Sequence, residues 1–402
     1  MINIESFISK HITFREKSFF QDDLTRFAGK LNERIEGKSA LVIGGGGTIG
    51  SSFIRELLKY NPSKLYVVDL SENYLTELTR DLRSTYKMRV PEDYKTYPIN
   101  FDDAVFDRIL EYAGPFDIVA NFAAHKHVRS EKDQYSVIAL LENNILKAEK
   151  LLSKLAATPP EHFFCVSTDK AANPVNIMGA SKKIMEEVIM AYAGHFPITT
   201  ARFANVAFSN GSLLAGYLER MMKNQPLSCP SDIRRFFVSP QESGQICLMA
   251  CILGDSGEIF FPKLEEEQMM NFKDITIEYL QQQGYEPLIC ASEEEARYEA
   301  SVMKRDSKRY PVYFFESDTS GEKTFEEFYT EGEVLDMETF TSLGIIKNAP
   351  RRSIETIRNM VDELKSVLQS HDLTKAEIVR VMTTYLPGFH HIETGKNLDQ
   401  KM

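Results

Sequence analysis

The sequence has 402 residues, of which 43% are hydrophobic and 26% are charged, so it can bury a large core in several domains or in one large α/β unit with a satellite. The net charge of −11 argues against a nucleic-acid partner, because binding to phosphates needs a basic surface. No apolar run reaches the roughly 20 residues that span a bilayer, and residues 1–10 lack a secretory pattern, so we expect no membrane contact.

The five cysteines show neither a CxxC pair nor the spacing of metal ligands. Core thiols in a reducing compartment are the better interpretation, and we therefore expect a cytoplasmic protein. His125 and His127 lack a third partner at a suitable spacing, so the sequence predicts no metal site.

Residues 1–38 are predicted to form a helical lead-in whose apolar anchors are Phe14, Phe19, Phe20, Leu24 and Phe27. From 39 to about 203, short β-branched runs alternate with amphipathic helices, which predicts parallel βαβ units and a Rossmann-type doubly wound sheet. The expected strands are Ala40–Ile43, Leu65–Val68, Tyr97–Ile99, Ile118–Ala120, Phe163–Val166 and Ile198–Ala201.

Residues 204–402 are predicted to form a smaller substrate-binding region and a helical C-terminal appendage, with the chain crossing between the two parts of the fold. Two strands are expected there, Pro287–Cys290 and Pro311–Phe315, and residues 354–368 keep helical spacing. Capping-box pairs mark two helix starts, Ser292 with Glu295 and Thr374 with Glu377.

A glycine loop follows the first expected strand directly and precedes a helix. Gly44, Gly47 and Gly50 have a GxxGxxG spacing, a variant of the dinucleotide fingerprint. The first glycine allows the tight turn, the second lets the backbone approach a pyrophosphate, and the third lets the helix pack close to the sheet. A flexible turn is the plainer alternative, and a P-loop is excluded because no Lys follows the last glycine.

The second expected strand is followed by Asp69, 19 positions after Gly50. An acidic residue there accepts hydrogen bonds from the adenosine ribose and repels a 2′-phosphate. No Arg follows within residues 69–73, so the sequence favours NAD over NADP, although Asp69 could also be a solvated residue at a strand end.

Asp169 and Lys170 follow the fifth expected strand. In a doubly wound sheet, ligands bind just beyond the carboxyl ends of the strands. An adjacent Asp and Lys can divide the acid and base roles if their surroundings move their pKa values toward neutrality. Such a dipeptide is usually a surface pair, but its position here favours chemistry.

These stretches belong to a longer pattern: GGGGTIGSS at 44–52, VVDLSEN at 67–73, NFAAHKHV at 121–128, VSTDKAANPVNIMGASK at 166–182, ARFANVAFSNGS at 201–212 and DIRRFF at 232–237. In their order and spacing, the chain resembles the extended short-chain dehydrogenases. Within these it resembles the bacterial UDP-N-acetylglucosamine 4,6-dehydratases of surface-polysaccharide biosynthesis, in a soluble form. The resemblance spans roughly residues 38–262 and is most specific at 166–182.

The resemblance implies a reaction in which NAD takes a hydride from C4 of the sugar. The resulting ketone acidifies the C5 proton, which a base removes while an acid protonates the departing C6 hydroxyl. The hydride then returns to C6, so the cofactor is regenerated. By motif match, Lys170 is the base at C5, Asp169 is the acid at C6, and Thr168 bonds near the C4 oxygen.

Met178 stands where the superfamily has the catalytic Tyr of its YxxxK motif, and Lys182 is the Lys of that motif, expected to hold the nicotinamide ribose. A thioether cannot take the proton of the C4 hydroxyl. Which group does so stays open, with Asp169 or a water held by Thr168 as the candidates.

The resemblance also implies the residues that line the two ligands. Those expected at the cofactor are Gly44, Gly47, Thr48, Ile49, Gly50, Asp69, Ser71, Asn100, Phe101, Ala123, Ala124, Ser167, Lys182 and Val206. Asn100 stands where the superfamily commonly has Asp, but it can still pair with the adenine amino group. Those expected at the substrate are Lys126, His127, Asn205, Ser212 and Arg235, of which Arg235 meets the UDP phosphates.

Two alternatives remain open. One is a nucleotide-sugar epimerase on the same scaffold, although plain C4 epimerisation needs no second acid and base. The other is a cofactor-binding sensor without catalysis, which only Met178 supports. The resemblance further implies a homo-oligomer that pairs helices at about 135–157 and 177–194.

Overall fold

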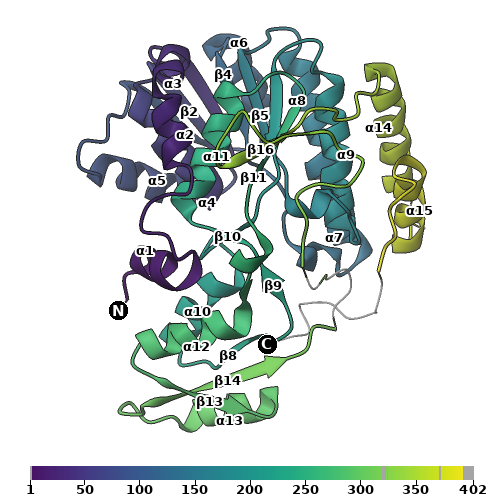
Figure 1. Ribbon diagram of the computed structural model, residues 1–402. Coiled ribbons are helices and arrows are strands. Elements are labelled where there is room, and N and C mark those ends of the chain that lie inside the picture. The colour runs from purple at the N-terminus through teal and green to yellow at the C-terminus, as the bar shows by residue number, and fades with distance from the viewer. Residues whose placement is uncertain (1, 319–322, 324, 371–372, 393–402) are drawn as a thin grey trace.

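The computed structural model describes residues 2–318, 323, 325–370 and 373–392. Within this part of the chain, a nine-stranded sheet forms the centre of the larger of two lobes, in the order β15-β16-β11-β6-β5-β4-β1-β2-β3 (Figure 1). Its strands are β1 (Ser39–Ile43), β2 (Lys64–Asp69), β3 (Asp93–Pro98), β4 (Ile118–Asn121), β5 (His162–Val166), β6 (Ile198–Ala201), β11 (Glu258–Pro262), β15 (Leu335–Asp336) and β16 (Leu343–Ile346).

The strands from β3 to β11 run parallel, and β16 then pairs antiparallel with both β11 and β15. Strand order reverses between β1 and β4, which is the switch point at which such sheets bind ligands. The predicted Rossmann-type doubly wound sheet is therefore confirmed, and it takes strands from beyond residue 203 as well.

Helices cover both faces of this sheet, so that its inner strands are buried along nearly their whole length rather than on alternate residues (Figure 1). The helices of the larger lobe are α2 (Gln21–Arg26), α3 (Ala28–Ile35), α4 (Thr48–Leu57), α5 (Glu72–Ser84), α6 (Ala104–Ala113), α7 (Gln134–Leu141), α8 (Lys147–Leu155), α9 (Ile177–Ala191), α11 (Pro240–Leu253), α14 (Ile354–Leu368) and α15 (Lys375–Tyr385). Short turns of helix lie at η2 (Leu58–Tyr60), η3 (Val128–Glu131), η4 (Glu142–Leu146) and η5 (Asp169–Ala171).

The helices α4 and α11 cross closely because of a glycine. A Cβ at Gly244 of α11 would lie 2.4 Å from the carbonyl carbon and oxygen of Ser52 on α4. Backbone atoms cannot move aside as a flexible side chain can, so only glycine allows this approach. The crossing fixes the helix that follows the glycine loop against the core.

The smaller lobe contains a parallel sheet of β8 (Leu227–Pro230), β14 (Arg309–Phe315) and β13 (Glu286–Cys290). It also contains α10 (Leu213–Met222), α12 (Phe272–Gln282) and α13 (Glu293–Val302). The N-terminal α1 (Ile4–Phe7) and η1 (Ile8–Ile12) pack into its core (Figure 1). Two short strand pairs lie at the junction of the lobes. They are β7 (Asn205–Val206) with β10 (Phe237–Val238), and β9 (Arg234–Arg235) with β12 (Met270–Asn271). A short helical turn, η6, spans Glu266–Gln268.

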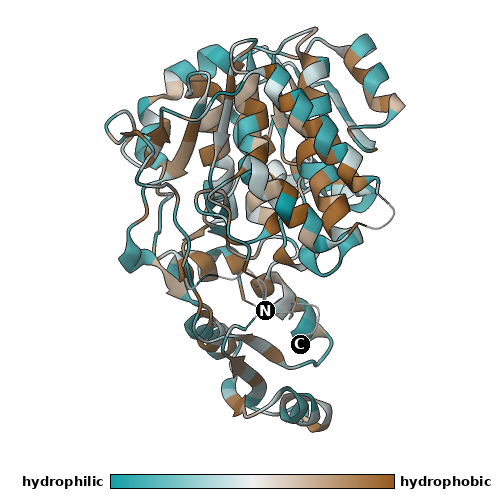
Figure 2. Ribbon diagram, turned by 90° about the vertical axis from the view of Figure 1, so that its right-hand side faces the viewer, coloured by the Kyte–Doolittle hydropathy of each residue, from teal (hydrophilic) through white to brown (hydrophobic). Residues whose placement is uncertain are grey.

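The C-terminal helices α14 and α15 pack on α9, and α14 also contacts η4. Figure 2 faces this side of the molecule and shows hydrophobic and hydrophilic residues alternating along the helices there. An ion pair of 2.7 Å between Arg352 and Glu187 fastens α14 to α9. The chain's own C-terminal helices therefore cover part of the surface for which the resemblance implied subunit contacts.

Most of the strands predicted from the sequence lie where they were expected, but the third one does not. It spans 93–98 instead of 97–99, because β3 is an edge strand whose half-buried residues give no apolar run. Phe14 is also not an apolar anchor: it is 68% exposed and has a φ of 53°. None of the described helices is long and apolar enough to cross a membrane.

Of the two predicted capping boxes, the one formed by Thr374 and Glu377 is complete. At the other, Ser292 caps its helix by accepting from the Glu295 backbone N–H. The Glu295 carboxylate accepts from the N–H of Ala291 instead of Ser292. The helix start was therefore predicted correctly, but one hydrogen bond of the box is shifted by a residue.

Candidate active site

The glycine loop is pressed between the end of β4 and the start of α4. Gly44 has a φ of 73°, and a Cβ there would lie 2.5 Å from the backbone nitrogen of Ala123. A Cβ at Gly50 would lie 2.4 Å from the carbonyl oxygen of Gly44. The expected turn at Gly44 and the expected close packing at Gly50 are thus both present.

Gly47 differs from these two glycines, because a Cβ there would meet nothing nearer than the Gly44 oxygen at 3.5 Å. It is the N-cap of α4 and supplies no side-chain hydrogen bond to the first turn of the helix. Protein packing therefore does not require glycine at this position. A ligand that lies directly against the backbone would require it, because a Cβ would occupy the same space. The residues present fit a phosphate group held by a helix N-terminus.

Asp69 ties the end of β2 to this loop. Its carboxylate accepts from the backbone N–H of Gly46 at 3.0 Å and from that of Ser71 at 2.9 Å. Each oxygen keeps a further lone pair, so the carboxylate can also accept from a ribose hydroxyl. Asp69 is half-buried, which leaves it within reach of a ligand in the loop.

Three loops meet beside the start of α4. The Asn210 N–H donates to the Thr48 hydroxyl at 2.9 Å, and Lys126 Nζ donates to the Asn210 carbonyl at 3.1 Å. Next to them, a Cβ at Gly211 would lie 3.1 Å from Nε2 of His127. The structure thus brings together Thr48 with the predicted substrate residues Lys126 and His127.

Other residues expected at the ligands have evident structural partners. Ser212 caps α10 by accepting from the Ala215 N–H at 3.2 Å, and Asn205 pairs with Phe237 through β7. The rest lie near strand ends or in the core: Asn100 accepts from the Asp102 N–H at 3.1 Å, Phe101 and Val206 are buried, and Ile49 and Ala124 are half-buried.

Directly beyond β5, the buried Asp169 pairs with Lys170, whose side chain is 17% exposed. Oδ1 of Asp169 accepts from the Thr168 hydroxyl at 2.8 Å, from the Lys170 N–H at 2.9 Å and from Lys170 Nζ at 3.1 Å. The Asp169 N–H donates to the carbonyl of Phe203, beyond β6. These bonds fix the pair at the carboxyl edge of the sheet, so the surface-pair interpretation does not hold.

Glu326 and Arg235 extend this centre. The Glu326 carboxylate lies 3.7 Å from Lys170 Nζ and 4.0 Å from the Arg235 guanidinium, and both glutamate and arginine are buried. Burial alone would lower the pKa of Lys170, but the carboxylates of Asp169 and Glu326 outweigh this and raise it. The pKa of Glu326 is raised, chiefly by its own burial.

The start of α9 packs against the same centre. A Cβ at Gly179 would lie 2.6 Å from the Lys170 carbonyl oxygen. Met178 is buried, and its N–H donates to the carboxylate of Glu131 at 2.8 Å. Lys182 is also buried and donates to the Val166 carbonyl at 2.6 Å, and burial lowers its pKa.

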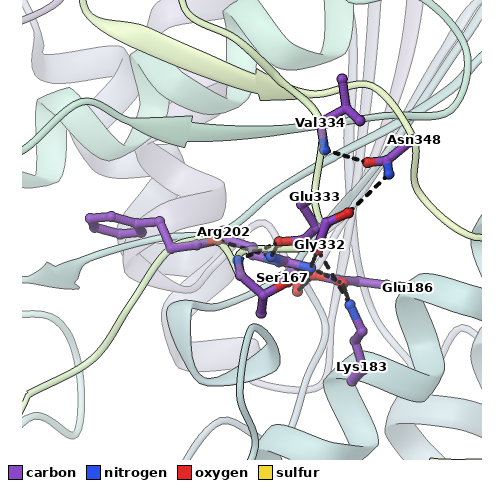
Figure 3. Close-up of polar contacts among 10 residues, drawn as sticks. Ser167, Lys183, Glu186, Arg202, Gly332, Glu333, Val334 and Asn348 are labelled. Atoms are coloured by element: carbon purple, nitrogen blue, oxygen red, sulfur yellow. Dashed lines mark hydrogen bonds and ion pairs between the residues drawn. The ribbon is translucent and has the colours of Figure 1, made fainter.

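Figure 3 shows a network of polar contacts around the buried Arg202, which also includes Ser167, Lys183, Glu186 and Glu333. Arg202, which has no exposed surface, donates to both oxygens of Glu186 at 2.9 and 3.0 Å and to both oxygens of Glu333 at 2.8 and 2.9 Å. Lys183 lies 3.6 Å from each of the two carboxylates. Burial would raise the pKa of Glu186, but Arg202 and Lys183 lower it to about 2.

This network holds the active-site segments on both sides. The Ser167 hydroxyl donates to Glu186 at 2.6 Å, immediately before Thr168 in the chain. Arg202 also donates to the carbonyl of Phe328 at 2.9 Å, two residues after Glu326. The segment at 326–333 is therefore anchored next to the end of β5, although it is far from it in sequence.

Comparison with known proteins places the chain in a family. The model of the family described as "Polysaccharide biosynthesis protein" matches residues 40–348. The chain belongs to this family. The match includes both lobes and ends just beyond the segment that carries Glu326 and Glu333, but it does not reach α14 and α15.

Among its relatives is an uncharacterized membrane protein, MJ1061, of Methanocaldococcus jannaschii, which is 30% identical over 77% of this chain and 85% of that protein. The capsular polysaccharide biosynthesis protein CapD of Staphylococcus aureus is 28% identical over 74% of this chain and 49% of its own length, so the chain spans about half of CapD. A UDP-N-acetylglucosamine 4,6-dehydratase (inverting) of Campylobacter jejuni is 26% identical over 59% of this chain and 70% of that enzyme.

Solved structures show the same fold at low sequence identity. Pen from Bacillus thuringiensis is 21% identical, with a TM-score of 0.63 over 84% of this chain and 99% of Pen. A UDP-N-acetylglucosamine 4-epimerase from Methanobrevibacter ruminantium is 14% identical, with a TM-score of 0.54 over 83% of this chain and 99% of the epimerase. The chain therefore shares its fold with Pen and with this epimerase.

Sequence reasoning missed Glu326, Glu131 and the network around Arg202. Glu326 and Glu333 lie in an acidic, aperiodic stretch that carries no motif. Arg202 was the one residue with a usable signal, since an Arg directly after a buried strand needs a partner. In the described part of the chain, no cluster of three or more His, Cys, Asp or Glu residues could hold a metal ion.

Proposed function

We propose that this family member is a nucleotide-sugar 4,6-dehydratase that acts on UDP-N-acetylglucosamine with NAD. The observation that carries the proposal is the Asp169–Lys170 pair, which is largely shielded from solvent and joined at 3.1 Å beyond β5, with Arg235 and Thr168 nearby. A relative that matches 59% of this chain is itself a UDP-N-acetylglucosamine 4,6-dehydratase (inverting). An adjacent acid and base are what water elimination across C5 and C6 needs.

The cofactor site supports the same proposal. The open backbone at Gly47 and the uncapped start of α4 would hold the pyrophosphate of NAD, and Asp69 would accept from its adenosine ribose. A 2′-phosphate would be repelled by Asp69, so we propose NAD over NADP. Bound NAD would supply a hydride acceptor for C4 and a hydride donor for C6.

The hydrogen bond from Thr168 to Asp169 suggests how the C4 hydroxyl loses its proton without the superfamily Tyr. The Thr168 hydroxyl donates to Asp169 and so has lone pairs free to accept from the sugar hydroxyl. A proton passed along this bond would leave Asp169 protonated. Asp169 could then give that proton to the departing C6 hydroxyl, while Lys170 removes the C5 proton and later returns it to C5.

The test is to incubate the purified chain with UDP-N-acetylglucosamine and follow the sugar by NMR. A new C6 methyl group together with a C4 keto or hydrate signal is expected. An intact hydroxymethyl group with inverted C4 would point to an epimerase instead, and an unchanged sugar with bound NAD would contradict the proposal.

A matched pair of lysine variants tests the base. Lys170→Ala should abolish exchange of the C5 proton with solvent deuterium, because no other amine is bonded to Asp169 among the described residues. Lys154→Ala removes a lysine of α8 that is paired with Asp107 of α6. This variant should exchange the C5 proton at the wild-type rate. Exchange that persists in Lys170→Ala would refute the assignment of the base.

A further inference from the structure

Glu326 reaches the Asp169–Lys170 centre from a segment that no sequence motif connects with it. Its side chain is 4% exposed, and its carboxylate lies between Lys170 Nζ at 3.7 Å and Arg235 at 4.0 Å. The neighbouring Glu327 is exposed and bonded to Asn173 at 2.7 Å. The two adjacent glutamates therefore differ sharply, since one points into the centre and the other points away.

The charged groups that face Glu326 come from three elements. Lys170 and Asp169 lie in η5, Arg235 lies in β9, and Lys323 lies in the same segment as Glu326. Burial raises the pKa of Glu326, Asp169 raises it further, and the three cations oppose this. Any ligand that draws Arg235 away would leave Glu326 a stronger proton acceptor.

The proposed reaction cannot start while Lys170 is an ammonium ion, which is the form that the neighbouring carboxylates favour. Lys170 has to be a neutral amine to remove the C5 proton, but the two carboxylates keep it an ammonium. Asp169 cannot take that proton, because it has to remain a carboxylate until it receives the proton of the C4 hydroxyl. A second acceptor beside Lys170 is therefore required.

We propose that Glu326 is this acceptor, a positioning residue that takes the proton of Lys170 when the nucleotide sugar binds. The diphosphate engages Arg235, an N–H bond of Lys170 breaks, and an O–H bond forms on Glu326. The freed electron pair stays on Nζ, which then attacks the C5 proton. This inference rests on the dehydratase function proposed above.

The consequence is a rate that does not depend on pH in the neutral range, because the proton moves inside the protein. In Glu326→Gln the ammonium has to lose its proton to solvent. Its kcat should fall by about 10²-fold near pH 7 and recover about tenfold per pH unit as the pH rises, with little change in KM. Glu327→Gln, the adjacent control, should keep the wild-type rate and pH profile.

Glu326→Asp keeps a carboxylate and should keep the flat pH profile at a reduced rate, which guards against a variant that merely misfolds. Two results would overturn the inference. One is a Glu326→Gln rate equal to that of the wild type, and the other is an equal loss at every pH without recovery.

A second measurement separates this inference from the proposed function. The pH dependence of acylation of Lys170, followed by mass spectrometry on the whole chain, needs no turnover. In the protein without sugar, the Glu326 carboxylate raises the pKa of Lys170, so its loss should let Lys170 react at lower pH than in the wild type, whereas Glu327→Gln should not change the labelling profile. A wild type that dehydrates nothing would refute the function, and an unchanged labelling profile would refute the role of Glu326.

Discussion

Replacing Arg202 with methionine should lower the melting temperature by about 4–6 °C. The substitution removes every hydrogen bond that joins Glu186 and Glu333 to the guanidinium, and both carboxylates stay largely buried. Only Lys183, 3.6 Å from each, remains to compensate them among the described residues. Removing one partner of a buried ion pair typically costs about 3–5 kcal/mol, because a charge is left without compensation.

The temperature shift follows from the size of the chain. Unfolding entropy is about 2.1 cal/mol/K per residue near 60 °C, so a chain of 402 residues loses about 1.2 °C of melting temperature for each kcal/mol. Scanning calorimetry or thermal unfolding followed by circular dichroism at neutral pH measures this change in melting temperature. The control is Arg55→Met, which breaks a partly exposed pair with Asp81 and should change the melting temperature by less than about 1 °C.

A triple variant distinguishes charge from packing. In Arg202→Met with Glu186→Gln and Glu333→Gln, neither buried carboxylate keeps a charge. Only Lys183, whose side chain is 17% exposed, then loses its two carboxylate partners, so most of the lost stability should return. A triple variant as unstable as Arg202→Met would show that the loss comes from hydrogen bonds and packing. A single variant as stable as the wild type would refute the reasoning altogether.

Three other substitutions test separate parts of the fold. Gly244→Ala places a Cβ against the Ser52 backbone and should cost about 1–3 kcal/mol by calorimetry, whereas Gly216→Ala, with open space around it, should be neutral or stabilise by up to about 1 kcal/mol. The pKa of Glu186 in the folded protein is lowered to about 2. The stability that its charge contributes is therefore fully present above the unfolded pKa of 4.5 and is lost as the pH falls toward 2. The melting temperatures of wild type and Glu186→Gln should therefore converge with falling pH. Asp69→Asn should reduce the preference for NAD over NADP by about tenfold or more in titration calorimetry, and an unchanged ratio would exclude Asp69 as the discriminating residue.

The sequence was sufficient wherever the signal is local. The glycine loop lies between a strand and a helix, and Asp169 and Lys170 directly follow a strand, so their place at the carboxyl edge follows from chain order. The edge strand β3 was misplaced because half-buried residues carry only a weak apolar signal. Phe14 was wrongly predicted to be an apolar anchor, because an aromatic residue in an irregular segment can point to solvent.

The network around Arg202 could not be predicted in the same way. Arg202 and Glu333 are 131 residues apart, and no periodicity or motif links a strand end to a loop at that distance. A buried charge in the sequence states that a partner must exist but not where it is. The same holds for Glu326, which is recognisable only once the fold has brought it to Lys170.

One guanidinium connects stability with the proposed chemistry. Through Glu186, Arg202 reaches the Ser167 hydroxyl, one residue before Thr168. Through the Phe328 carbonyl it holds the segment that carries Glu326. The donor and the acceptor of the proposed proton transfer are thus fixed to a common anchor, although they come from distant parts of the chain. The 3.7 Å between Lys170 Nζ and Glu326 is longer than a hydrogen bond, so the transfer needs one bridging water or a small closure from a well-defined starting position. A buried, fully bonded arginine is a more rigid anchor for that position than a loop packed only by apolar contacts. The buried Arg202 therefore does more than stabilise the fold: its hydrogen bonds hold Glu326 beside Lys170.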